Sequence, residues 1–399
     1  MAFLHHGCRA SAICPPGHPL RFVAGIESHY PYKGLDSLGS LKEAILAAQP
    51  ALIVPCDDSV VWQLHELHTR HAELRPLIER SLGAKEKYPV IRSRGAFLQA
   101  ASKLGIRVPL TRKVTSEDDL TAWWTGAPVV LKRDGTWGGS GVAIVDSLSE
   151  ALMAFRRLSR RIKIGLAWKR WLINRDPIAI WSWQRQETPS VTLQEYISGR
   201  PANSMIACWQ GELLAIVSVE VLTAQGVTGA ATAVRLLQNK EMEQTARRLA
   251  RELMLNGFHG LDFVIEEHTG AAYLIELNPR CTQLGHLRLP PHGDLAGAIS
   301  ANLWKEPEST DLDEENFIQE DTIAFFPQTF NWNPKSPYLR SGYHDVPWEE
   351  PALLRELLRK SWPERQWLYR IYHYYRPVKQ QQEVKFDSSP ADLVHTDKA

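Results

Sequence analysis

The feature that most constrains this chain is the stretch from residue 260 to residue 280, GLDFVIEEHTGAAYLIELNPR. Two runs rich in strand-forming residues flank the turn-like sequence EEHTG, which predicts a β-hairpin centred on Thr269. In that register Asp262 lies opposite Glu276, roughly 5 Å away, and residues 264 and 266 lie opposite 274 and 272. Because side chains two apart on a strand share a face, Asn278 joins Glu276 on the same side.

Two carboxylates and an amide brought together in apolar surroundings need a compensating cation, because an unpaired buried charge is costly. Magnesium prefers such hard oxygen ligands, together with the phosphates of a substrate. For any single acid, a carboxylate that merely faces water is the simpler interpretation. For Asp262, Glu276 and Asn278 together, followed by Arg280, the pattern predicts a site for Mg²⁺ or Mn²⁺.

Composition narrows the partners and the compartment. The formal charge of the 399 residues is +1, so no global field draws the protein to nucleic acid. The five cysteines are scattered and form no CxxC pair, which favours a reducing, cytoplasmic location and opposes a thiolate zinc site. No apolar run reaches the length of a membrane span, so we expect no stable membrane insertion.

The front of the chain, residues 1–85, alternates strand-like runs (11–14 and 51–58) with helical patterns (38–49 and 60–70). Such alternation predicts a parallel sheet with helices on its faces. The first residues, MAFLHHG, read as the end of a helix with no strand before it, so we expect this front domain to be incomplete at its start.

A second candidate site is the segment 128–145, PVVLKRDGTWGGSGVAIV, in which two strands flank a glycine-rich turn. Closely spaced glycines let backbone N–H groups approach phosphate oxygens, and Lys132 adds a positive charge. Alone this signal is weak, since a glycine-rich turn between two strands is usually a simple hairpin. The sequence has no GxxxxGK[ST] motif, so it contains no P-loop.

Together these segments resemble the ATP-grasp superfamily. A lysine-bearing strand, a glycine-rich turn, the segment QEY and a hairpin that ends IELNPR occur in that order between about Arg92 and about Ala298. The resemblance extends to carboxylate–amine ligases and to the ATP-binding domain of the carbamoyl-phosphate synthase large subunit. It implies an α/β protein with an α+β grasp core, divided into a pre-grasp domain (1–85), a grasp domain (86–310) with a lid at about 109–198, and an extension (311–399) whose tail is disordered from about 379.

The resemblance also implies a reaction. Family members use ATP and Mg²⁺ to activate a carboxylate as an acylphosphate, which an amine or similar nucleophile then attacks. The expected partners are therefore small-molecule carboxylates and amines, with a homo-oligomer as a further expectation. The alternative is a catalytically silent ATP-binding sensor or partner-recruiting module. It is suggested by the clipped start and by Pro201, which stands where many family ligases carry an acid that holds the ribose; Asn203 is a candidate replacement.

Residue roles follow from the resemblance, position by position. Arg280 matches the residue that steadies the transferring phosphoryl group, and Lys132 and Arg94 match phosphate-binding residues. Gln194 is expected to reach the adenine through its side chain, and Glu195 and Ile197 through backbone groups. The loop over the terminal phosphates corresponds to Gly138, Gly139, Ser140 and Gly141, and the metal ligands to Asp262, Glu276 and Asn278.

Departures from the pattern disfavour two subclasses. Biotin carboxylases place a catalytic glutamate four residues beyond the arginine of their signature, where this sequence has Leu284. Carbamoyl-phosphate synthases resemble the stretch GVTGAATAV, but they carry the grasp twice on a far longer chain, with an arginine in place of Gln283. Neither activity is expected here.

Several residues near these motifs have two interpretations. His286 and His292 could carry protons, but orienting a loop is the simpler role. Asp57 and Asp58 end an apolar run where ligands bind in open sheets, but one of them could equally cap the next helix. The basic, Trp-bearing segment 156–175 could seek lipid or RNA; a solvated helical excursion whose tryptophans pack back on the body is the favoured interpretation.

Overall fold

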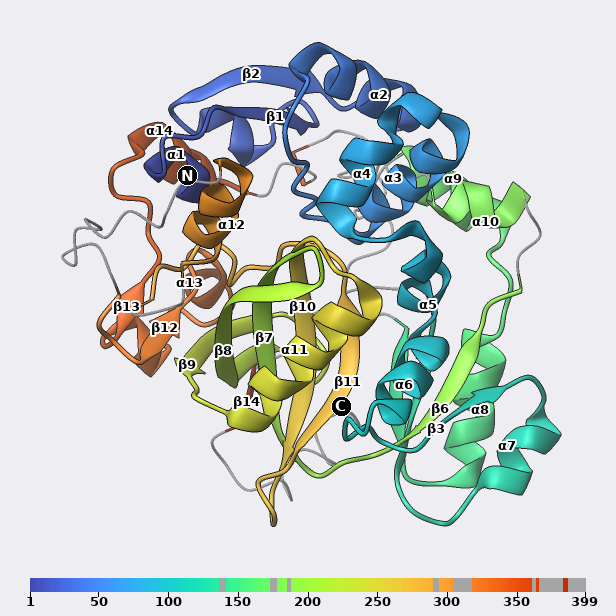
Figure 1. The fold of residues 1–399 in the computed structure, drawn as a ribbon. Helices are drawn as coiled ribbons and strands as arrows, with labels where there is room; N and C mark the ends of the chain where they lie inside the picture. The colour runs from blue at the N-terminus through green and yellow to red at the C-terminus, as the bar shows by residue number, and fades with distance from the viewer. Residues whose placement is uncertain are drawn as a thin grey trace.

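The computed structural model describes residues 1–135, 141–172, 178–184, 188–289, 294–304, 318–360, 364–365 and 383–386. Three regions can be distinguished in Figure 1. The front region, in blue, lies at the top, the large sheet in green and yellow lies at the centre, and a smaller sheet with its own helices lies at the lower right. The protein is a mixed α and β fold, as the sequence predicted.

The front region has a smaller sheet than expected. Strands β1 (Ala10–Cys14) and β2 (Ile26–Pro31) pair in parallel, with α2 (Ser37–Ala48), α3 (Asp58–Arg70) and α4 (Arg75–Leu82) beside them. The strand expected at 51–58 is wrong as a sheet member, and β2 was not foreseen. Residues 51–55 run between two apolar clusters, with Ile53 facing one and Leu52 and Val54 the other.

The lid is a four-stranded antiparallel sheet in the order β3-β6-β4-β5. Its strands are β3 (Thr111–Val114), β6 (Val191–Glu195), β4 (Val129–Arg133) and β5 (Val142–Val145). Helices α7 (Glu117–Trp123) and α8 (Leu148–Leu158) cover one face, around Leu120, Leu131 and Phe155. Helix α8 is capped by Ser147, whose Oγ accepts from the Glu150 N–H.

An excursion between α8 and β6 carries α9 (Ile164–Leu172) and α10 (Ile178–Gln184), which lie beside α3 at the right of Figure 1. Trp171 Nε1 donates to the Gly34 carbonyl at 3.0 Å, so this part of the lid rests on the front region. Ala167 and Ile180 are buried between the two helices. Trp171 therefore packs on the body, as the favoured interpretation of the basic segment predicted, whereas Trp168 is 43% exposed. Within the described ranges, no helix combines the length and apolar character needed to cross a bilayer.

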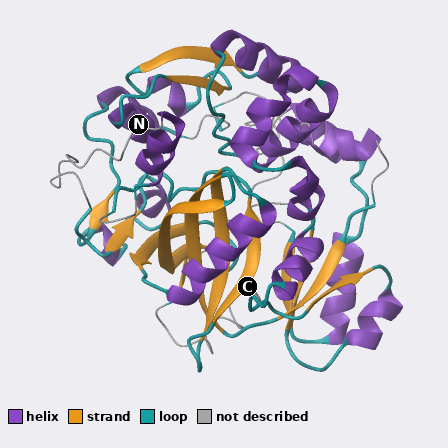
Figure 2. Ribbon diagram, in the orientation of Figure 1, coloured by secondary structure: helices purple, strands orange, loops and turns teal. Residues whose placement is uncertain are grey.

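The central sheet runs β11-β10-β7-β8-β9-β12-β13, and β14 pairs with β8 off this path. Figure 2 shows its strands in orange, with a helix lying across them. The bounds of these strands are β7 (Gly199–Trp209), β8 (Glu212–Gln225), β9 (Ala231–Leu236), β10 (Gly257–Glu266), β11 (Ala272–Asn278), β12 (Thr322–Ala324), β13 (Tyr343–His344) and β14 (Glu383–Lys385).

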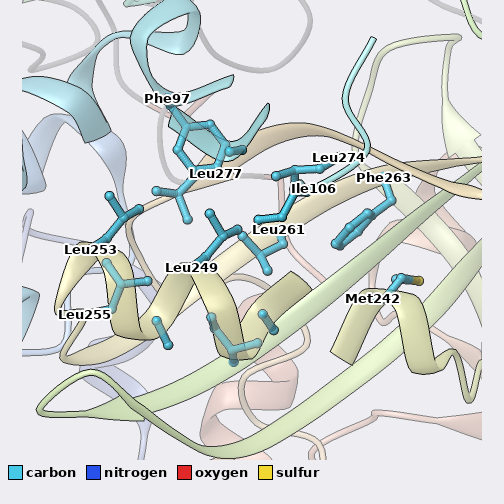
Figure 3. Close-up of a cluster of buried hydrophobic side chains, with 14 of the residues drawn as sticks. Phe97, Ile106, Met242, Leu249, Leu253, Leu255, Leu261, Phe263, Leu274 and Leu277 are labelled. Atoms are coloured by element: carbon cyan, nitrogen blue, oxygen red, sulfur yellow. The ribbon is translucent and has the colours of Figure 1, made fainter. Parts of the chain in front are cut away.

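Helices cover both faces of the central sheet. Helix α11 (Lys240–Leu253) begins at Asn239, whose side chain accepts from the Met242 N–H, and it buries an apolar stripe three and four residues apart. With α6 (Arg94–Lys103) it forms the core in Figure 3, which includes Leu249, Phe263 and Leu274. Helix α12 (Leu295–Trp304) packs on the opposite face. Truncating a buried leucine such as Leu249 to alanine would cost about 2–5 kcal/mol.

The last part of the chain is more closely tied to the core than expected. Strands β12 and β13 extend the central sheet beyond β9, followed by α14 (Pro351–Leu357). The prediction of disorder from about 379 is wrong at β14, where Glu383–Lys385 pairs with Thr223–Gln225. A three-residue edge strand carries no helix or strand pattern of its own, so only its partner reveals it.

Candidate functional site

The hairpin places the expected acids side by side. Asp262 lies opposite Glu276, and Gly260 lies opposite Asn278. Beyond this point the register shifts by one and Phe263 pairs with Leu274. The expected pairings of 264 with 274 and of 266 with 272 are therefore wrong. Ile275 is the extra residue of a β-bulge, and bulges redirect side chains where a strand approaches a site.

Asp262 is held by two amides. Asn203 Nδ2 donates to Asp262 Oδ1 at 2.6 Å, and Asn278 Nδ2 donates to Oδ2 at 3.0 Å. Burial and the neighbouring Glu276 carboxylate raise the Asp262 pKa to about 6, against the lowering effect of the amides. Asn203 lies on β7 directly opposite Asp262, so its side chain is engaged there and is not the ribose contact that was considered.

Glu276 meets a cation instead. Arg94 Nη2 donates to Glu276 Oε1 at 2.7 Å. Burial alone would raise the Glu276 pKa, but the charges of Arg94 and Lys132 outweigh it and leave this pKa lowered. Glu276 keeps 28% of its side chain exposed, so it faces the cleft while remaining ionised.

Arg94 connects the lid to the central sheet. It is the first residue of α6, after the N-cap Ser93. Besides Glu276, its guanidinium reaches the Arg133 carbonyl at 3.4 Å and the Asp134 carboxylate at 3.7 Å, both at the end of β4. The Arg94 side chain is only 9% exposed, so it is fixed between acids of both regions.

Lys132 approaches the same space from the lid. It lies on β4, is 5% exposed, and lines the cleft with Asp262 and Glu276. Burial lowers the Lys132 pKa to about 8, assisted by the positive charge of Arg94 and opposed by Glu276. An anion bound beside Lys132 would raise this pKa and favour the protonated, charged form of the side chain.

Arg280 is oriented by the front region. Asp58 Oδ2 lies 2.8 Å from Arg280 Nε, an ion pair between α3 and the residues after β11. Asp57 caps α3 by accepting from the Ser59 N–H at 2.7 Å. The capping interpretation therefore holds for Asp57, whereas Asp58 belongs to the cluster around Arg280.

Of the three residues expected to contact the adenine, only two line the cleft. Glu195 and Ile197 line it. Gln194 does not: its side chain is 2% exposed and donates to Thr111 Oγ1 at 3.2 Å inside the lid. The Glu195 N–H is engaged by the Leu110 carbonyl at 2.9 Å. The geometry thus does not support a Gln194 side-chain contact to adenine.

The expected phosphate loop is described only at its end. Gly138, Gly139 and Ser140 lie outside the described residues, whereas Gly141 lines the cleft. His292 also lies outside them. His286 Nε2 lies 3.2 Å from Asp345 Oδ2, which agrees with an orienting role. Leu284, at the position of the biotin carboxylase glutamate, is 3% exposed in the apolar core.

The cleft is large enough for a nucleotide. Its volume is about 1830 Å³, and its walls come from the lid, the central sheet and α3. A second cavity of about 2130 Å³ lies between the front region and α9–α10. The two adjoin, because Trp62, Asp134, Gly135, Val142 and Arg157 line both.

The donor set at the hairpin fits a hard dication. Asp262 and Glu276 offer carboxylates and Asn278 an amide on one face, and Mg²⁺ is commonly bound by one or two carboxylates with substrate phosphates. Burial, and then the neighbouring Glu276 carboxylate, raise the Asp262 pKa, and a dication bound there would favour the ionised form. In the described part of the chain, no group of three His, Cys, Asp or Glu side chains converges as a metal cluster, so the site depends on the amide and on a substrate.

Two residues of the candidate site could not be predicted from sequence motifs. Asn203 reaches Asp262 only because β7 pairs with β10, and β7 begins with GRPANS, which reads as a loop. Asp134, beside Arg94, lies just after β4 at the edge of the glycine-rich turn. The signal that could have found Asn203 is the alternation of the strand that follows Pro201.

Comparison with known proteins agrees with this geometry. A family model of the ATP-grasp domain matches residues 178–283. The chain has an ATP-grasp fold. N5-carboxyaminoimidazole ribonucleotide synthetase from Thermus thermophilus superimposes with a TM-score of 0.53 at 16% identity, over 77% of this chain and 75% of that one.

Two further ATP-grasp structures are similar. The synthetase from Staphylococcus aureus complexed with ADP gives a TM-score of 0.54 at 13% identity, over 77% and 73% of the two chains. A biotin carboxylase complex from Campylobacter jejuni gives 0.54 at 14%, over 79% and 68%. No significant match was found among curated proteins. At these identities the likeness is one of fold.

Proposed function

We propose that this ATP-grasp protein binds ATP with Mg²⁺ in the cleft and uses it to activate a carboxylate for attack by an amine. One observation carries the proposal: acids of the central sheet and cations of the lid face each other across a single space. Asp262 and Glu276 stand on one side, and Lys132 on the other, with Arg94 between them. Such a space suits a polyphosphate and its dication.

Each of these residues would have its own role in phosphoryl transfer. This reaction requires that the reactants are positioned and that their negative charge is neutralised. Lys132 and Arg94 would hold phosphate oxygens, and Arg280, fixed by Asp58, would steady the transferred group or the acylphosphate. The dication, held by Asp262, Glu276 and Asn278, would supply electrostatic stabilisation of the phosphates. Without these cations the carboxylate and the triphosphate would repel each other.

The adjoining cavity is our proposed location for the carboxylate and the amine. It meets the nucleotide cleft at Asp134 and Gly135, which follow the strand of Lys132. Its lid side carries Arg157 and Arg161, basic groups suited to an acid substrate. The adenine would meet backbone groups near Glu195 and Ile197, without the Gln194 side chain.

Two measurements test the proposal, and the first is ATP binding. Calorimetry of ATP with Mg²⁺ should give a metal-dependent affinity that Glu276→Gln weakens about 100-fold, the upper end of the loss seen on disturbing metal coordination. Glu267→Gln, in the exposed turn of the same hairpin, is the matched control and should bind normally. ATP binding abolished equally in both, or independent of Mg²⁺, would overturn the proposed site.

The second measurement is turnover, which distinguishes a ligase from a nucleotide sensor. ADP release should rise when pooled carboxylates and amines are added, and mass spectrometry should identify the ligated product. Tight ATP binding with no stimulated ADP release from any pool would instead support the alternative, a nucleotide sensor that has no ligase activity.

A further inference from the structure

Cys56 and Cys281 lie on two segments that meet beside Arg280. Cys281 follows Arg280 directly, and Cys56 precedes the Asp57–Asp58 pair at the start of α3. Each thiol affects the pKa of the other: Cys281 lowers that of Cys56, and Cys56 raises that of Cys281. The proposed function does not use either sulfur.

The backbone holds these two segments together. The Cys281 N–H donates to the Pro55 carbonyl at 2.9 Å, which sets the chains at about the spacing of neighbouring strands, roughly 5 Å. A disulfide spans Cα atoms about 4.4–6.8 Å apart, a range that includes the spacing of neighbouring strands. Cys281 Sγ also occupies the space over Gly285, where a Cβ would lie 2.2 Å from it.

Cys56 is the more reactive and more accessible of the two. It is exposed and lines the larger cavity, whereas Cys281 is half-buried. The hydrogen bond from Cys281 lowers the Cys56 pKa, burial opposes this, and the Arg280 cation adds to the lowering. The thiolate is the nucleophilic form, so Cys56 is the sulfur expected to react first.

The remaining cysteines differ in their surroundings. Cys14 and Cys208 are 4% and 0% exposed, and burial raises the pKa of each. Cys8 is half-buried, with its sulfur 3.3 Å from Ser300 Oγ. A selective reagent would therefore distinguish Cys56 from the rest.

We propose that Cys56 and Cys281 form an oxidant-sensitive dithiol site that a hydroperoxide converts into a disulfide beside Arg280. The Cys56 thiolate attacks one peroxide oxygen, the O–O bond breaks, and an alcohol or water leaves after taking up a proton. Cys281 then attacks the resulting sulfenic acid, the S–O bond breaks, and water leaves with the hydroxyl and the thiol proton. Two thiols and one hydroperoxide thus give one disulfide, one alcohol or water, and one further water.

Hydrogen peroxide is the probe, applied to the full chain under native conditions. Non-reducing peptide mass spectrometry should show a peptide pair joined through Cys56 and Cys281, with loss of two of the five free thiols and their recovery by dithiothreitol. Cys8→Ser, the matched control, should form the same linkage. Cys56→Ser should abolish it and leave Cys281 reduced.

Two results would overturn the proposal. One is oxidation of Cys56 to sulfinic or sulfonic acid while Cys281 stays reduced in the folded protein. The other is a linkage that appears only after the chain is unfolded with denaturant. Because the parent chain gives the decisive result, a Cys56→Ser variant that fails to fold does not affect the test, and neither does any failure of ATP binding.

Discussion

The central hairpin and the lid sheet place polar groups in apolar strands with opposite results. On the hairpin, burial and then the neighbouring Glu276 carboxylate raise the Asp262 pKa to about 6. On the lid, Lys132 is buried with Arg94 nearby, and its pKa falls to about 8. For both side chains burial disfavours the charged form, and a bound ligand of opposite charge would favour it. The difference indicates a cleft organised around a bound cation and a bound anion together.

Removing Arg94 should break this arrangement most strongly. Arg94→Met would leave Glu276 and Asp134 without their cation, and breaking a largely buried pair costs about 3 kcal/mol of unfolding free energy. The loss, measured by denaturant unfolding, should shrink when Mg²⁺ is added, because the dication replaces the missing charge.

Arg107→Met is the control for that change. Arg107 pairs with Glu241 on the surface, where such a bond is worth about 0–1 kcal/mol, and Mg²⁺ should not affect it. Equal destabilisation by both substitutions would show that Arg94 is an ordinary surface charge.

The lid side can be tested through pH. As pH rises through about 8, Lys132 loses its charge, so ATP affinity should fall, by about tenfold between pH 7 and pH 9. Lys132→Arg should flatten this profile, since arginine stays protonated. Calorimetry at several pH values provides the measurement, and a profile that is unchanged by the substitution would contradict the role of Lys132.

The same group has the opposite effect on stability. Its folded pKa lies below the unfolded value of 10.5, so the charged form is disfavoured in the folded state. That penalty is fully present below about pH 8 and disappears between pH 8 and 10.5, so this contribution to the stability of the ligand-free protein improves as binding weakens.

A substitution beside Asp262 tests the acidic side of the cleft, and its expected effect is smaller. Asn203→Ala removes one amide from Asp262, so the Asp262 pKa should rise above about 6 and Mn²⁺ affinity at pH 6 should fall about tenfold. The deficit should narrow at pH 8, where Asp262 is ionised in both proteins. Asn302→Ala on α12 is the control, and a pH-independent loss would contradict this explanation.

The smallest effect concerns the contact between lid and front region. Trp171→Phe removes the indole N–H that donates to the Gly34 carbonyl, worth about 1 kcal/mol. Hydrogen exchange should increase at residues 34–36 and in α9. Trp168→Phe, an exposed position in the same helix, should leave it unchanged.

Local patterns predicted the parts of the site that local structure determines. The hairpin register at Asp262 and Glu276 followed from strand alternation, although the bulge at Ile275 was not legible. Strand β7 was missed because Pro201 and Gly199 read as a loop. Pro201 is tolerated there because β8 pairing begins only at Ala202, so the strand is edge-like at that point.

Long-range contacts set the rest. Nothing in the sequence around Asp58 indicates that it will meet Arg280, since the two come from distant segments. The resemblance supplied the position of Gln194 on its strand but not its surroundings, and the fold buries that side chain against Thr111. Residues 51–58 have the composition of a strand, yet no neighbouring strand is present to complete a ladder in the described chain.

The bond between Trp171 and Gly34 gives the lid a second point of attachment, remote from the strands where it joins the central sheet. A lid attached only to the central sheet could move by itself, whereas a lid attached at both ends passes its movement on to the front region. Widening of the nucleotide cleft would therefore either break the hydrogen bond between Trp171 and Gly34 or move the front region together with the lid.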